Sequence, residues 1–112
     1  MKRKLSEKRN EMTPAALAYL GDSVIEVLAR ELLVEKGIPD SARLNTAAAK
    51  YVRATAQSEA VERLSSVMND AEAAVYRRGR NVGHTNTPRS ASAAEYRRAT
   101  GMEALFGWLW LG

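Results

Sequence analysis

The sequence predicts an all-α fold in a single domain, and three observations lead to this prediction. The chain has 112 residues, which is room for one domain. Its apolar residues recur at three- and four-residue steps, the spacing of an amphipathic helix, and strand-favouring runs of Val, Ile, Thr and aromatic residues are absent. Alanine, the best helix former, is frequent.

The domain is expected to span residues 13–112, because residues 1–12 are basic, show no apolar period and are predicted to be a flexible lead-in. Thr13-Pro14 opens the first helix, since Thr can cap and Pro is tolerated at the first helical position. Its inward-facing side is predicted to carry Ala16, Leu17, Leu20, Val24, Val27, Leu28 and Leu32. The helix is expected to stop at Gly37 to Asp40.

Three shorter helices are predicted to follow. One runs from Ser41 to about Ala56, and the next begins near Ser58. Asn69-Asp70 breaks the pattern, and Asp70 is expected to cap a helix that ends at Gly79. The apolar residues predicted to face inward are Leu44, Ala48, Tyr51, Val52, Val61, Leu64, Val67 and Met68.

A long irregular stretch and a strongly signalled helix complete the five predicted helices. Residues 79–90, GRNVGHTNTPRS, form a loop of a length that is usually functional in a small domain. Ser92 followed by Glu95 has the spacing of a capping box. Beyond it the apolar face continues through Met102, Leu105, Phe106, Leu109 and Trp110.

Composition excludes several classes of site and location. The chain has no cysteine, so disulfides and thiolate-ligated zinc or iron–sulfur centres are excluded, and its one histidine cannot form a multi-histidine metal site. No segment approaches the roughly 20 apolar residues of a membrane span, and no apolar signal-peptide core follows the basic N-terminus. A soluble cytoplasmic protein is expected.

Positive charge is concentrated near the irregular stretch. The net charge is +4, but residues 76–98 alone carry six arginines against one glutamate, a local charge of +5. Arginine favours bidentate contacts with phosphate oxygens, so this clustering indicates a polyanionic partner. The alternative is an ordinary solvated surface.

Two acids, Asp22 and Glu103, lie in otherwise apolar helices, where a carboxylate loses hydration and must be paired, hydrogen-bonded, neutralised or metal-bound. Gly21 lies beside the first acid, and Gly101 and Gly107 flank the second; glycine inside a helix indicates close helix approach. If the helices cross there, the carboxylates converge and offer the oxygen ligands that Mg²⁺ accepts. The alternative is that they pair with Arg97 or Arg98.

Three segments resemble motifs of the ribonuclease III family. Residues 16–30, ALAYLGDSVIEVLAR, are similar to the family's signature helix with its Leu-Gly-Asp-Ser core, and residues 99–111, ATGMEALFGWLWL, to its second motif, Glu-Ala-Leu-x-Gly. Arg-Arg-Gly-Arg-Asn at 77–81, with Thr87-Pro88 downstream, resembles Mini-III ribonucleases, which lack a separate double-stranded-RNA-binding domain. The resemblance covers residues 13–111 with the motifs in order.

The resemblance implies a ribonuclease III endonuclease-domain-like fold working as a two-fold homodimer. It implies that Asp22 and Glu103 are catalytic and hold Mg²⁺, with Mn²⁺ able to substitute, and that metal-bound water cleaves double-stranded RNA to 5′-phosphate and 3′-hydroxyl ends. A ribosomal RNA precursor is the expected substrate. Tyr19, in the signature helix, is expected at the dimer interface or in the core.

Other residues are assigned supporting roles. Glu26, one turn beyond Asp22, is a candidate to orient metal-bound water, although pairing with Arg30 at the i,i+4 spacing is the preferred interpretation. The predicted RNA-contacting residues are Arg77, Arg78, Arg80, Asn81, His84, Thr85, Thr87 and Arg89. Shape-based recognition of A-form RNA suits such a basic loop.

Two other functions are compatible with the same residues. One is a non-catalytic RNA-binding protein on the ribonuclease III fold, because longer family members have further acids where this chain has Ala15, Ala18 and Thr100. Mini-III enzymes lack the same additional acids, and retention of both Asp22 and Glu103 argues for catalysis. The other is a helical interaction protein whose arginines serve solubility.

Overall fold

Helices make up all the regular structure in the computed structural model, which describes residues 2–52, 54–82 and 92–112. The elements in these ranges are α1 (Lys2–Lys8), the 3₁₀ turn η1 (Arg9–Glu11), α2 (Pro14–Glu35), α3 (Ser41–Val52), α4 (Ala54–Leu64), α5 (Asp70–Arg80) and α6 (Ala93–Leu111). No strand occurs in them, so the all-α prediction is confirmed. None of these helices is long and apolar enough to cross a membrane.

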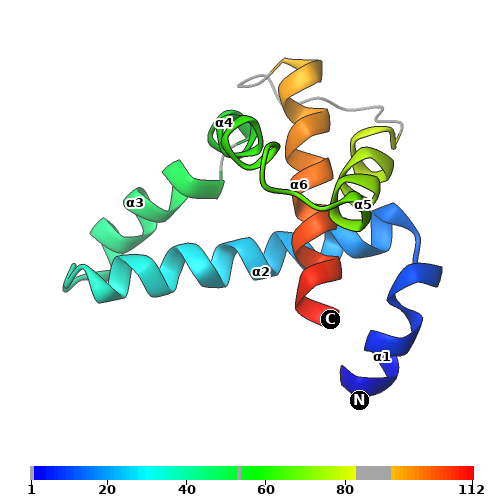
Figure 1. Ribbon diagram of the computed structural model, residues 1–112. Helices are drawn as coiled ribbons and strands as arrows, with labels where there is room; N and C mark the ends of the chain where they lie inside the picture. The colour runs from blue at the N-terminus through cyan, green and yellow to red at the C-terminus, as the bar shows by residue number, and fades with distance from the viewer. Residues whose placement is uncertain (1, 53, 83–91) are drawn as a thin grey trace.

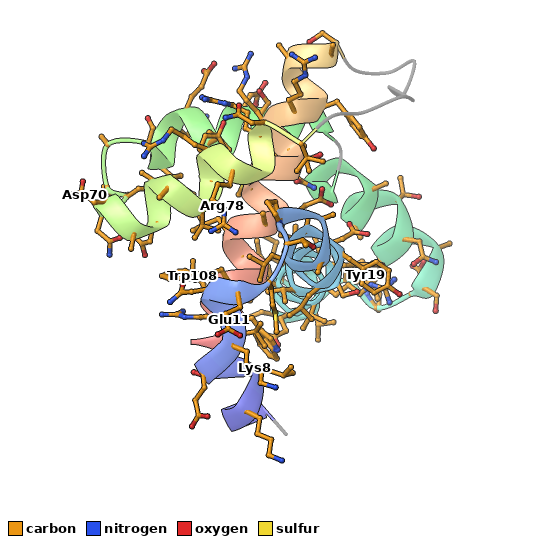
Figure 2. The ribbon with its side chains drawn as sticks, turned by 90° about the vertical axis from the view of Figure 1, so that its right-hand side faces the viewer. Lys8, Glu11, Tyr19, Asp70, Arg78 and Trp108 are labelled. Carbon is orange, nitrogen blue, oxygen red and sulfur yellow. The ribbon has the colours of Figure 1, made fainter. Side chains whose placement is uncertain are left out.

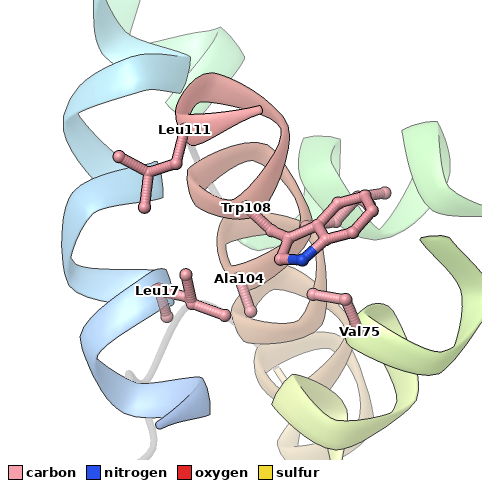
Figure 3. Packing of buried hydrophobic residues seen from close by; sticks show 7 residues of the cluster. Leu17, Val75, Ala104, Trp108 and Leu111 are labelled. Carbon is pink, nitrogen blue, oxygen red and sulfur yellow. The ribbon is translucent and has the colours of Figure 1, made fainter. Parts of the chain in front are cut away.

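Helix α6 lies at the centre of the fold, with α2, α4 and α5 packed around it (Figure 1). Apolar residues surround almost its whole circumference, which is the pattern of a buried helix. One core cluster joins α6 to α2 and α5 through Leu17, Ala18, Val75, Ala104, Leu105, Trp108 and Leu111 (Figure 3). A second cluster brings α4 into the core through Ile25, Val61, Tyr76 and Met102.

Helix α2 begins and ends as its sequence predicts. The Thr13 hydroxyl accepts a hydrogen bond from the Ala16 backbone N–H at 3.1 Å, and Pro14 is the first helical residue. Gly37, at φ +82°, adopts the left-handed conformation that follows many helix ends. The predicted inner side is wrong in its second half, because Val27, Leu28 and Leu32 remain 41–48% exposed.

The boundary between α3 and α4 differs from the prediction of one helix to Ala56 and another from Ser58. Helix α3 ends at Val52 and α4 begins at Ala54, earlier than expected. The first turns of α4 carry two buried polar residues, Gln57 and Ser58, each 3% exposed. A prediction from the spacing of apolar residues cannot detect polar residues that face inward. The predicted start of this helix is therefore too late.

Capping boxes begin both α5 and α6. At α6 the Glu95 backbone N–H donates to the Ser92 hydroxyl at 3.1 Å, and the Ser92 N–H donates to the Glu95 carboxylate at 3.0 Å, as predicted. Hydrogen bonds from the Ser92 backbone and side chain to the carboxylate lower the pKa of Glu95. At α5 the cap is Asn69 with Glu72, so the expectation that Asp70 caps is wrong by one residue.

We expect Ser92→Ala to lower the free energy of unfolding by about 1 kcal/mol, because the first turn of α6 loses its side-chain acceptor. The urea midpoint reports this change. Ser66→Ala, an exposed position outside any helix, is the control and is expected to change little. An unchanged midpoint for Ser92→Ala would show that this cap contributes nothing to α6.

The first twelve residues differ from the predicted flexible lead-in, since residues 2–11 form α1 and η1 against the end of α6 (Figure 1). The Arg9 guanidinium donates to the Trp108 backbone carbonyl at 3.0 Å. The same guanidinium stacks over the Trp108 indole ring, 3.6 Å from the ring centre. The Trp108 indole N–H donates to the Asn10 side chain at 2.9 Å, and Leu5 and Met12 pack on the core. These contacts join distant parts of the chain, so no local period predicts them.

Candidate active site

The crossing of α2 and α6 brings their backbones into direct contact. A Cβ atom added to Gly21 would overlap the backbone carbonyl oxygen of Glu103, and one added to Gly107 would overlap the carbonyl oxygen of Leu17. Only glycine fits at these two positions, because the obstructing atoms belong to the opposite backbone. The prediction that glycine marks a close helix approach is therefore confirmed, with Gly107 as the partner of Gly21.

Gly101 serves a different contact. It lies against Tyr76 and the backbone of α5, while a Cβ on Gly79 would come within 2.7 Å of the Ala104 side chain and 3.0 Å of the Gly101 Cα. The α5–α6 contact is therefore a second close approach. Helix α6 is consequently fixed on two sides, which sets the position of the residues it carries.

The α2–α6 crossing places the Asp22 and Glu103 side chains together, and a hydrogen bond joins them. Burial, this hydrogen bond and the negative charge of Asp22 raise the pKa of Glu103 to about 8. Glu103 is half-buried, whereas Asp22 is exposed. The expectation that both acids lose their hydration thus holds for Glu103 and is wrong for Asp22.

Arginine does not neutralise this pair in the way the alternative interpretation proposed. Arg98 forms an ion pair with Glu62 of α4 at 2.9 Å. Arg97 lies beside Arg98 in a separate pocket between α5 and α6. Among the described residues, no ion pair involves Asp22 or Glu103. Each of these two acids therefore has the other as its carboxyl partner.

The pair offers a divalent cation two carboxylate groups, one of them exposed. No cluster of three or more acidic, histidine or cysteine side chains that could hold a metal occurs in the part of the chain that the structure describes. Thr100, where longer family members have an acid, is buried and donates its hydroxyl to the Tyr96 carbonyl at 3.0 Å. The donor set fits Mg²⁺, which takes one or two protein carboxylates and keeps several waters.

Glu26 is engaged by a neighbour on its own helix. Its carboxylate accepts a hydrogen bond from Arg30 at 2.5 Å, at the i,i+4 spacing that the sequence favoured. Both side chains are exposed, at 45% and 61%. The preferred interpretation of Glu26 is confirmed, and a role in orienting water stays a prediction.

The predicted RNA-contacting residues separate into two groups. Arg78 turns toward the start of α2 and donates to the Met12 carbonyl at 3.1 Å (Figure 2). Arg80 and Asn81 instead line the pocket that also contains Arg97 and Arg98. Arg77 is exposed on α5. His84, Thr85, Thr87 and Arg89 lie outside the described residues.

The pocket between α5 and α6 is the feature that sequence reasoning missed. Its two arginines from α6, Arg97 and Arg98, lie in the basic window of the sequence, where they are predicted only as possible partners of the acids. Sequence spacing does not show that the end of α5 and the start of α6 lie side by side, because residues 81–92 separate them in the chain. The signal available was the Arg97-Arg98 doublet itself.

Comparisons with known proteins find a matching family, similar sequences and a similar fold. Residues 15–112 match the family described as Ribonuclease III domain. The chain is 43% identical over 100 residues to Mini-ribonuclease 3 of Symbiobacterium thermophilum, covering 89% of this chain and 77% of that protein. It is 36% identical over 110 residues to Mini-ribonuclease 3 of Brevibacillus brevis, covering 98% and 82%.

The fold is also that of a solved structure. A crystal structure of a protein from Fusobacterium nucleatum superposes with a TM-score of 0.82, at 26% sequence identity, over 93% of this chain and 83% of the other.

Proposed function

Because this chain belongs to the ribonuclease III family and is an endoribonuclease, we propose that it cleaves double-stranded RNA using Mg²⁺ held by Asp22 and Glu103. The products would carry 5′-phosphate and 3′-hydroxyl ends. The observation that carries this proposal is the hydrogen-bonded pair of carboxyl groups at the α2–α6 crossing. Two acids 81 positions apart in the chain form one oxygen-donor site open to solvent at Asp22.

The chain's own groups have defined tasks in this reaction. When bound, Mg²⁺ would supply an activated water and neutralise charge on the phosphate. Glu103 must give up its proton before it can act as a ligand, and Asp22 provides the exposed carboxylate that faces solvent. Gly21 and Gly107 hold the two side chains in register because the helix backbones touch.

A cleavage assay on a blunt RNA duplex, with and without Mg²⁺, tests the proposal. We expect cleavage only with Mg²⁺, with Mn²⁺ able to substitute. A duplex that is bound but never cut would indicate the non-catalytic RNA-binding alternative. Absence of salt-dependent duplex binding would instead favour an interaction protein without nucleic acid.

We also propose that the active form is a homodimer. Helix α2 leaves Tyr19, Val27, Leu28, Leu32 and Val34 exposed by 41–85%, and Figure 2 shows Tyr19 pointing away from the core. Tyr19 is 85% exposed, so a core position is excluded. Leu28 and Leu32 also line an apolar pocket of about 260 Å³ with Met102 and Phe106. The exposed apolar side chains around this pocket are typical of an interface, and a second copy would bury them symmetrically.

We expect the double variant Leu28→Lys/Leu32→Lys to be monomeric at micromolar concentration, because charges would be buried in the interface. Sedimentation equilibrium measures the change against a dimeric wild type. Val67→Lys, at a 71% exposed site elsewhere, is the matched control and should stay dimeric. A double variant that dimerises as the wild type does would place the interface on another surface.

The natural substrate is proposed to be a base-paired precursor of large-subunit ribosomal RNA. The support is the similarity to Mini-ribonuclease 3 proteins together with the sequence motifs. Incubation with that precursor and with an unrelated duplex of equal length tests the assignment. Preferential cutting near the base-paired ends of the precursor is the expected result, and equal cutting of both would contradict it.

A further inference from the structure

A pocket separate from the acid pair lies between the end of α5 and the start of α6. Its volume is about 480 Å³, within the range of natural ligand sites. It is lined by Tyr76, Arg80, Asn81, Val82, Ala94, Arg97 and Arg98, and we call it the arginine pocket. The acid pair instead joins α2 to α6. The two sites therefore share a helix but use different neighbours of it.

The arginine pocket carries a strong and only partly compensated positive charge. Three guanidinium groups line it, and none of its described lining residues is acidic. Glu62 pairs with Arg98, but this carboxylate is 69% exposed to water. Glu95, the nearest acid on α6, accepts the backbone hydrogen bond of the capping box. One or two positive charges therefore remain for a ligand.

The buried ring of Tyr76 forms the wall beneath these arginines. Tyr76 is 9% exposed, and Arg80 lies 5.9 Å from the centre of its ring. Burial raises the pKa of Tyr76, while the positive charges of Arg80 and Arg98 lower it, which places both guanidinium groups within electrostatic reach of one phenol. The Arg80 side chain also donates to the Asn81 side chain at 3.4 Å.

We propose that the arginine pocket binds a backbone phosphate of the RNA at a distance from the cleaved bond. The inference rests on the proposed function and adds a contact that the acid pair cannot make, since the negative charge of Asp22 repels an RNA that arrives without metal. Planar guanidinium groups match phosphate oxygens bidentately, and phosphate contacts position a duplex independently of its sequence. Arg97 and Arg98 thereby join Arg80 and Asn81 as RNA-contacting residues.

A matched pair of variants tests the proposal without removing an arginine. Ala94→Glu places a carboxylate in the pocket, whereas Ala93→Glu places one beside it on the same exposed turn. Both keep α6 intact, because acids are favourable in the first turn of a helix. Affinity for an RNA duplex is measured without Mg²⁺, so that no cleavage occurs.

We expect Ala94→Glu to bind the duplex about tenfold more weakly than Ala93→Glu. Arg97→Gln is expected to lose a similar factor and to reduce the slope of log affinity against log salt by about 1, relative to Arg63→Gln, an exposed position on α4. Inorganic phosphate at high concentration should compete with the duplex for the wild type and lose this effect in Ala94→Glu.

Equal duplex affinity of Ala94→Glu and Ala93→Glu would overturn the proposal. Phosphate binding abolished by Ala94→Glu with duplex affinity unchanged would also overturn it, because the pocket would then serve free phosphate. The proposed function has a separate test. It would be wrong if the wild-type protein bound the duplex but did not cleave it in the presence of Mg²⁺. In that case a weaker Ala94→Glu would still support the pocket.

Discussion

Asp22→Asn and Glu103→Gln are each expected to lower the cleavage rate on duplex RNA by about 10³-fold while leaving the protein folded. Each variant replaces one carboxylate of a two-carboxylate site, so the cation loses half of its protein ligands. Loss of several kcal/mol of charge stabilisation corresponds to a decrease of this size. Single-turnover cleavage at saturating Mg²⁺ gives the rate.

Folding should survive both changes. Asp22 is exposed, and an exposed substitution changes stability by less than about 0.5 kcal/mol. Glu103 carries a proton at neutral pH, since its pKa is about 8, and glutamine has nearly the shape of the protonated acid. Duplex affinity without metal should be unchanged for Glu103→Gln, whose carboxyl is already neutral, and slightly higher for Asp22→Asn, because a negative charge near the RNA is removed.

Glu31→Gln is the control for these variants, because it makes the same chemical change at an exposed position on α2. It should cleave at the wild-type rate. Wild-type cleavage by either Asp22→Asn or Glu103→Gln would rule out the assignment of the site.

Gly21→Ala is expected to lower the free energy of unfolding by about 3 kcal/mol, which is a large share of the 5–15 kcal/mol typical of a folded domain. The added methyl group would overlap the Glu103 backbone carbonyl oxygen, so the two helices must separate. Separation also moves Asp22 away from Glu103, so we expect cleavage to fall even at temperatures where the variant is folded. Urea unfolding gives the stability.

Ser23→Ala, an exposed position two residues along the same helix, should change stability by less than about 0.5 kcal/mol. If Gly21→Ala were as stable as this control, the helix backbones could not be in contact at the crossing.

Sequence reasoning succeeds where the signal is local. Thr13 and Ser92 cap their helices as predicted because a cap is a relation between residues three positions apart. Gly21 and Gly107 predicted a close helix approach because glycine in a helix has a cost that needs a reason. The meeting of Asp22 and Glu103 followed from these glycines, and the structure shows it.

The predictions fail where packing between residues distant in the sequence determines the structure. Nothing near Arg9 in the sequence indicates that it stacks on Trp108, a contact that joins η1 to α6. The exposed apolar residues of α2, such as Leu28, have the same helical period as its buried ones, so periodicity cannot separate a core from an interface. The arginine pocket depends in the same way on how α5 and α6 meet.

Proton release on Mg²⁺ binding tests most directly whether the acid pair holds the cation. At pH 7 the Glu103 carboxyl carries a proton because its pKa is raised to about 8, and a ligand to Mg²⁺ must be deprotonated. Raising the pH through 8 removes this proton beforehand, so the apparent Mg²⁺ affinity should rise with pH and level off above 8. Titration calorimetry in two buffers of different ionisation enthalpy counts the protons.

We expect about one proton released per site at pH 7 and almost none at pH 9, with much weaker Mg²⁺ binding to Glu103→Gln. Mg²⁺ binding at pH 7 without proton release, or equally tight binding to Glu103→Gln, would contradict the account.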